Sequence, residues 1–318
     1  MPANTPPWPF LAAAYATAVG DACNKQNEKT AKACDPMGKS RKEKCKPTEK
    51  ERGDFKQAGK DKNRIKNAEM ARIKADRASS HLAPLSDSKL EEASKGTQAY
   101  KDALKAWNDG AEKMADAVAA DDCSKHLRCY LHPYKPSQCC PGQTGHHLVE
   151  ASAFVNSRGD KDKMVRVAGI GKYEPDKAPC ICVEGENQNQ GTHGLMHTYQ
   201  STAAGYTRNG GQLIEKSPGT IAMADGTTYN GITSTYGDAK EDGVKAVKKA
   251  FPESPCDPGC LIAQLDAYHN EVGLDDKTPC KAVVTGGHGQ KAQTNANQSV
   301  KSRSARLSAG KKSLKTKK

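Results

Sequence analysis

Four histidines in two pairs are the residues of this sequence best suited to chemistry. His146 and His147 directly follow Gly145, and His193 and His197 lie four residues apart in the segment GTHGLMH. On a helix, side chains at positions i and i+4 lie on one face, so His193 and His197 can hold one metal ion. Adjacent residues point in different directions, so one member of the first pair can join the ion while the other remains available as a base.

These residue types suit the hydrolysis of a phosphodiester with one divalent metal ion. An ion held by three imidazoles can stabilise the charge that develops on the phosphate and on the leaving oxygen. A neutral histidine, with an ordinary pKa of about 6.5, can deprotonate the attacking water at neutral pH. The candidate ions are zinc, magnesium, manganese and nickel, although magnesium prefers oxygen ligands. The alternative interpretation is two unrelated pairs of surface or core histidines.

The remaining histidines have no partner at ligand spacing, and we expect each to be an ordinary surface or core residue. They are His81, His126, His132, His269 and His288. A weaker hypothesis is a second metal site around Cys129, which His126 and His132 flank.

Secondary structure must bring the two histidine pairs together. Cys180 to Gly185 alternates like a short strand, and 190–206 has the pattern of a helix that would carry His193 and His197. We also expect a strand at 164–170, short strands and loops over 208–236, and helices at 67–78, 88–120, 239–251 and 259–272. In the helix at 88–120, Gly110 is expected to cause an interruption, and Trp107 is expected to pack in the core.

The positive charge is concentrated in two flanking arms. The chain has 49 Lys and Arg against 37 Asp and Glu, a formal net charge of +12. Residues 24–77 carry 18 basic and 9 acidic residues, and residues 301–318 carry 8 basic and none acidic. Basic arms attract polyanions such as nucleic acids, although they also serve as soluble tails. We expect 24–64 to be a loop or linker and the chain from 286 onward to be disordered.

The composition excludes some classes of protein. No apolar run approaches the roughly 20 residues that cross a bilayer, which excludes an integral membrane protein. No Lys or Arg precedes the apolar segment 10–20, so we expect an Ala-rich helix there rather than a secretory signal. Twelve cysteines without paired C-x-x-C spacing favour several disulfides over a zinc ribbon. Their pairing cannot be deduced from the sequence.

Gly145-His146-His147 followed by a helical His193-x-x-x-His197 resembles the GHH class of polymorphic toxin nuclease domains (Tox-GHH2-like) in the HNH/endonuclease VII superfamily. The resemblance covers about residues 130–206. It implies a ββα-metal finger, in which a β-hairpin lies over a helix and holds one ion. The separation of the two histidine pairs is long for this motif, so we expect residues 148–178 to be an insertion.

The resemblance implies a role for each histidine of the two pairs. His146 would be the first metal ligand, and His193 and His197 would be the ligands on the helix. His147 would be the general base.

The resemblance also implies roles for polar residues near the histidines. Asn189, or alternatively Asn187, corresponds to the asparagine that orients the base in such domains. Glu150, one turn after His147, would orient His147 or contact the ion, although a solvated helix residue is an equally good interpretation.

Domains of this kind form part of type VI secretion effectors. The resemblance therefore implies a DNase with little sequence specificity that is secreted without a signal peptide and acts in the cytoplasm of a target bacterium. The implied partners are DNA, a cognate immunity protein and PAAR- or VgrG-like components of the secretion tip, with no insertion into a membrane. No PAAR domain is apparent in this sequence.

We therefore expect an α+β fold in which a ββα-metal finger is embedded in a mostly helical, cysteine-rich domain with disordered basic flanks. The expected organisation is an N-terminal segment and basic linker (1–64), a helical region (65–120), the nuclease domain (121–285) and a basic tail (286–318). Two other functions stay open at this point. One is a non-enzymatic, disulfide-stapled basic protein that binds nucleic acid or acts as an adaptor, and the other is an RNase that uses the same site.

Overall fold

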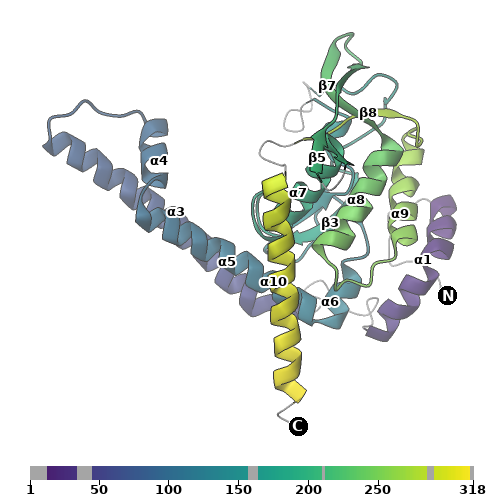
Figure 1. Cartoon of the computed structure of the whole chain (residues 1–318), viewed down its shortest axis with the longest axis horizontal. Coiled ribbons are helices and arrows are strands. Elements are labelled where there is room, and N and C mark those ends of the chain that lie inside the picture. Colours follow the sequence, from purple (N-terminus) through teal and green to yellow (C-terminus); the bar gives the residue numbers. More distant parts are fainter. Residues whose placement is uncertain (1–12, 34–44, 157–163, 210–211, 285–289, 316–318) are drawn as a thin grey trace.

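The computed structural model describes residues 13–33, 45–156, 164–209, 212–284 and 290–315. Figure 1 shows a body of short strands and helices, from which α3 (Glu49–Ser79) and α5 (Gln98–Ala120) extend together as an arm. Helix α4 (Asp87–Lys95) lies towards the far end of this arm. The mixture of helices and short strands confirms the predicted α+β class.

Close packing of aromatic rings against glycine joins the two long helices of the arm. The rings of Phe55 and Trp107 stack with centroids 5.9 Å apart, and Trp107 is buried as predicted. Gly110 does not interrupt α5. Instead it permits the close approach of α3, because a Cβ at this position would lie 3.2 Å from the Phe55 backbone. The predicted helix at 88–120 does break near Gly96, and Thr97 caps α5 by accepting a hydrogen bond from the Tyr100 N–H.

Both segments expected to be loop or disordered are largely helical where the structure describes them. Helix α1 (Ala13–Ala33), the short η1 (Lys46–Thr48) and the first half of α3 occupy the described part of 24–64, and α10 (Gln290–Lys315) occupies the C-terminal segment. A disulfide joins Cys23 in α1 to Cys260 in α9 (Pro258–Glu271). Buried Arg303 in α10 donates a hydrogen bond to the Ala250 carbonyl. Polar composition was misleading because these few tertiary contacts hold the helices.

A three-stranded antiparallel sheet lies next to the histidine pairs. Its order is β1 (His132–Pro133), β3 (Pro179–Glu184) and β2 (Gln143–His147). Helix α7 (Gly191–Gly205) follows β3 and packs against β2 and β3, which gives a ββα arrangement. The predicted strand and helix of this region are thus confirmed.

The described residues of the long connection between β2 and β3 contain little regular structure. They include the 3₁₀ helix η2 (Ala151–Ala153). The strand predicted at 164–170 is wrong, because the described residues there form only isolated bridges at Arg166 and Val167. Val167 and Ile170 are buried in the core instead, and Met164 and Val165 are partly buried against it.

The second half of the body combines short strands with two helices. The strands are β4 (Tyr206–Asn209), β5 (Gln212–Glu215), β6 (Pro218–Ala222), β7 (Thr228–Thr235) and β8 (Pro279–Lys281). Helices α8 (Tyr236–Ala250) and α9 confirm the predicted helices at 239–251 and 259–272. The short α6 (Asp122–Leu127) follows α5. Among the described residues, none of the helices is both long and apolar enough to span a membrane.

Disulfides connect segments that are far apart in the sequence. Besides Cys23–Cys260, the pairs among the described residues are Cys45–Cys140, Cys129–Cys256 and Cys139–Cys182. Cys180 and Cys280 are buried thiols. The hypothesis of a metal site around Cys129 is wrong, since its sulfur is bonded to Cys256 and His126 contacts Gln26 instead.

Candidate functional site

The ends of β2 and α7 position the two histidine pairs. His146 and His147 are the last residues of β2, opposite Ile181 and Cys180 of β3. Gly191 begins α7 with φ of 53°, and a Cβ there would lie 2.6 Å from the Glu184 carbonyl oxygen. Only glycine fits this close, left-handed turn without strain.

A buried polar cluster fixes the start of α7 to the end of β3. The Thr192 hydroxyl accepts a hydrogen bond from the Glu184 N–H at 2.8 Å and donates one to the Glu184 carboxylate. Arg128 forms a buried ion pair with the same carboxylate, and Gln143 donates to it from β2. Because Thr192 directly precedes His193, this cluster sets the position of the first histidine on the helix.

The structure brings His146, His193 and His197 together. One nitrogen from each ring lies within 4.8 Å of the others, and all three residues are buried. The Nε2 atoms of His193 and His197 are 3.2 Å apart. The ring of His146 meets both of these rings edge-on, with centroids 5.3 Å and 4.6 Å away. The three residues are thus arranged so that one small cation could contact all of them.

Hydrogen-bond partners fix which ring nitrogen His146 and His197 present to the centre of the histidine cluster. Gln200 donates from its amide nitrogen to the carbonyl oxygens of His147 and Leu148, so its amide oxygen faces Nε2 of His146. That nitrogen must carry the proton, which leaves Nδ1 of His146 as its metal-binding atom. Glu150 Oε1 lies 2.9 Å from Nδ1 of His197, which leaves Nε2 of that ring as the corresponding atom.

The electrostatics of the cluster favour a neutral His146 beside an ionised Glu150. Burial, together with the neighbouring rings of His197 and His193, lowers the pKa of His146 well below its usual 6.5. Burial alone would raise the pKa of Glu150, but its hydrogen bond to His197 and the nearby histidines hold it at about 2. A neutral imidazole offers a lone pair to a metal, and the carboxylate adds negative charge that attracts a cation.

His147 lies beside this cluster in a different setting. Its Nε2 is 2.9 Å from the Pro175 carbonyl oxygen, and its ring stacks on Tyr134 with centroids 5.0 Å apart. Because a carbonyl only accepts hydrogen bonds, Nε2 of His147 carries the proton, and Nδ1 is the atom that can accept another. His147 shares a cleft of about 470 Å³ with His146, His193 and His197.

The other predicted site residues line the same cleft but are placed differently. Asn189 is exposed at the mouth, where its N–H donates to the side-chain oxygen of Asn187. Glu150 lies against His197, so the sequence-based expectation that it orients His147 does not match the geometry. Glu150 lies in neither a helix nor a strand, because it directly precedes η2 in the connection between β2 and β3.

The donor set fits a divalent transition ion. Three imidazole nitrogens in one buried cluster, two of them with a fixed partner on the opposite ring nitrogen, match what zinc or nickel accept from proteins. The all-nitrogen set is a poor match for magnesium unless water completes the coordination shell.

Sequence reasoning missed Gln200, which contacts both segments of the site. It follows His197 by three residues and His193 by seven, a spacing that places all three on one helical face. That spacing was the available signal. The carbonyl of Pro175 gave no signal, because any residue has a carbonyl and only the fold places this one beside His147.

Comparison with known proteins finds a family match over the segment that contains the site. Residues 143–269 match the model of a family described as GHH signature containing HNH/Endo VII superfamily nuclease toxin 2. The matched segment includes both histidine pairs, the β2–β3 strands and α7. Over this segment the chain is therefore similar to GHH nuclease toxin domains.

A curated relative extends the similarity beyond that domain. The chain is 38% identical over 310 residues to a protein of Pseudomonas aeruginosa named DNase toxin Tse7. The alignment covers 97% of this chain and 64% of the relative, so the chain spans about two-thirds of that protein's length. No solved structure shows a significant match to the chain.

Proposed function

We propose that this chain is a metal-dependent endonuclease toxin that hydrolyses DNA with little sequence specificity. The observation that carries the proposal is the buried cluster of His146, His193 and His197 beside His147 in one cleft. The family match of residues 143–269 and the name of the Pseudomonas relative support the same activity.

In this proposal His146, His193 and His197 hold one divalent ion, which would act as a Lewis acid toward the phosphodiester. His147 accepts a proton from water at Nδ1, while its Nε2–H stays bonded to the Pro175 carbonyl. The stack on Tyr134 restrains the ring in that orientation. Glu150 orients His197. Asn189 or Asn187 helps to position the wall of the cleft near the base, His147.

The proposed setting is that of an antibacterial effector. We propose that the toxin reaches the cytoplasm of a target bacterium through a secretion tip with PAAR- or VgrG-like components, and that an immunity protein protects the producer. The similarity to a named DNase toxin supports this setting. Expression of the chain inside a bacterial host should arrest growth and degrade the nucleoid, whereas the His147→Ala variant should be harmless.

The enzymatic test uses the full chain and plasmid DNA. Zinc, magnesium, manganese and nickel are added singly, and each reaction is repeated with EDTA. We expect cleavage that EDTA stops and that His147→Ala slows by roughly 10²–10⁴-fold, because the variant loses the base. Metal binding by this variant should persist. His81→Asn is the matched control, since His81 is exposed and lies at the end of α3.

Other outcomes would redirect the proposal. A mobility shift of DNA without cleavage, in every metal tested, would favour a non-enzymatic nucleic-acid-binding protein. Faster cleavage of RNA than of DNA at equal concentration would identify an RNase that uses the same site.

A further inference from the structure

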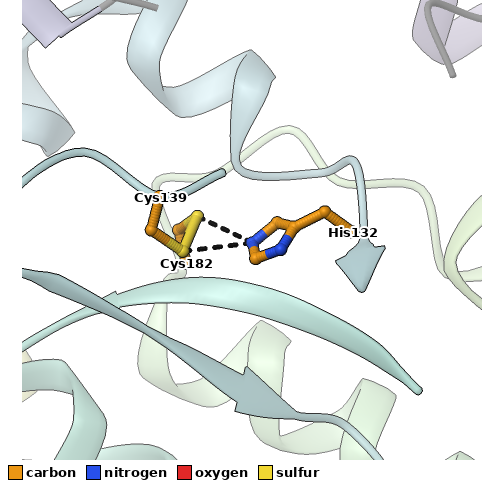
Figure 2. Close-up of side chains that lie close together, drawn as sticks. All are labelled: His132, Cys139 and Cys182. Atoms are coloured by element: carbon orange, nitrogen blue, oxygen red, sulfur yellow. Dashed lines mark hydrogen bonds between the residues drawn. A yellow bond between two sulfur atoms is a disulfide. The ribbon is translucent and has the colours of Figure 1, made fainter. Parts of the chain in front are cut away.

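A second group of side chains of metal-ligating types lies beside the three-stranded sheet, outside the cleft. His132 Nε2 is 3.0 Å from Cys182 Sγ and 3.1 Å from Cys139 Sγ. Figure 2 shows the imidazole pointing at the two bonded sulfurs. His132 and Cys139 are buried, and Cys182 is partly buried.

The tautomer of His132 places a lone pair on the nitrogen that faces the sulfurs. His132 Nδ1 is 2.9 Å from the Pro133 carbonyl oxygen, which can only accept a hydrogen bond. Nδ1 therefore carries the proton, and Nε2 of the neutral ring is an acceptor. A disulfide sulfur has no proton to donate, so this geometry suits an ion shared by nitrogen and sulfur better than it suits a closed disulfide.

Strand pairing keeps His132 near Cys182 independently of the disulfide. His132 of β1 is paired with Cys180 of β3, and Cys182 lies two residues further along the same face. The Cα atoms of Cys139 and Cys182 are 5.4 Å apart.

We propose that His132, Cys139 and Cys182 form a second metal site that binds zinc, or a comparably thiophilic divalent ion, once the Cys139–Cys182 disulfide is reduced. A dithiol reductant supplies two electrons and two protons, the S–S bond breaks, and the reductant leaves as its own disulfide. Metal binding then displaces the two thiol protons. Zinc holds sulfur at about 2.3 Å and nitrogen at about 2.0 Å, so the sulfurs must separate to roughly 3.8 Å. Rotation of the cysteine side chains supplies that movement.

Such an ion would replace the disulfide as the link between the segment before β2 and the strand β3. Cys182 lies opposite Gly145, directly before His146. The β2–β3 pair that presents the first histidine pair would therefore stay anchored in a reducing compartment, where disulfides are lost.

The test measures cobalt and zinc binding by the full chain without reference to nuclease activity. His193→Ala and His197→Ala are introduced together to disable the first cluster. The chain is prepared oxidised, or reduced with a phosphine that does not bind metal, and is then desalted after addition of Co²⁺. We expect about one equivalent of cobalt with a thiolate-to-cobalt charge-transfer band in the reduced sample only, and zinc should displace it.

Substitutions in the cluster identify the ligands. His132→Ala and Cys182→Ser should each abolish the charge-transfer band, whereas the matched control His126→Ala should retain it. The proposal is overturned if the reduced parent, folded or not, binds no cobalt with this band. It is equally overturned if His132→Ala keeps the same stoichiometry, which would assign the cobalt to other cysteines. Neither result bears on the nuclease proposal, because the first cluster is disabled in every sample.

Discussion

At the scale of single residues, Gln200 links the two halves of the histidine cluster. It belongs to α7, and its amide makes hydrogen bonds to His146 and His147 at the end of β2 and to Leu148, which follows. The two backbone acceptors determine which way the amide faces, and the amide in turn determines the tautomer of His146. The orientation of the first proposed ligand therefore depends on a neutral side chain that would not itself touch the ion.

We predict that Gln200→Leu weakens metal binding at this cluster by about 10–100-fold, because His146 loses the partner that fixes its tautomer. The dissociation constant of the ion, measured by competition with a chromogenic chelator, gives the result directly. Gln98→Leu serves as the control, since Gln98 is an exposed residue of α5. An unchanged dissociation constant for Gln200→Leu, with an unaltered circular dichroism spectrum, would contradict the assignment.

At the scale of elements, α8 packs against Leu148, the residue that follows the first histidine pair. Gly243 of α8 lies so close to the carbonyl of Leu148 that a Cβ would overlap its oxygen. Leu148 directly follows the first histidine pair, and its carbonyl also accepts from Gln200. The depth at which α8 packs thus affects where β2 ends and where His146 and His147 lie.

We predict that Gly243→Ala lowers the free energy of unfolding by about 1–3 kcal/mol, as expected for an extra methyl group in a packed interior. It should also slow DNA cleavage, because the Leu148 backbone has to move. The control is Gly53→Ala in α3, where the added Cβ has no neighbour within 4 Å. That change should be neutral or stabilise by up to about 1 kcal/mol, since alanine is the better helix former. Denaturant unfolding of both variants decides the matter, and equal stabilities would refute the packing argument.

At the scale of the whole molecule, long-range disulfides and buried polar residues hold the elements together. Cys23–Cys260 and Cys129–Cys256 close loops with sequence separations of 237 and 127 residues. The core also contains His269, whose Nδ1–H donates to the Leu265 carbonyl of its own helix and whose ring lies among aromatic rings. Burial lowers the pKa of His269 to about 3, so this histidine stays neutral in the folded protein.

This buried histidine makes global stability depend on pH. The unfolded chain binds a proton at His269 below about pH 6.5, whereas the folded chain does so only near pH 3. The contribution of neutral His269 to the free energy of unfolding is therefore fully present above pH 6.5 and is lost as the pH falls. Between pH 6.5 and pH 5 the loss is about 2 kcal/mol. We predict that His269→Gln flattens this pH dependence, as measured by urea unfolding of the oxidised protein with EDTA present. A slope equal to that of the parent chain would show that other groups control it.

The sequence alone predicted the histidine cluster and the strand and helix next to it. The residue types and spacings of His146, His147, His193 and His197 predicted one cluster, and the strand at Cys180 and the helix at 190–206 followed from periodicity over a few residues. These features are local, because side-chain direction in a strand or helix repeats every two or about 3.6 residues. The family resemblance and the α+β class were also available at this level.

Only the tertiary structure decided which groups surround the histidines and which polar segments become helical. The contacts of Gln200 with β2, of Pro175 with His147 and of Cys139 and Cys182 with His132 join residues separated by 7 to 54 positions. The helices α1 and α10 are held by a disulfide and a buried arginine that composition does not reveal. Such contacts depend on how distant elements pack together, and no local pattern in the chain encodes that packing.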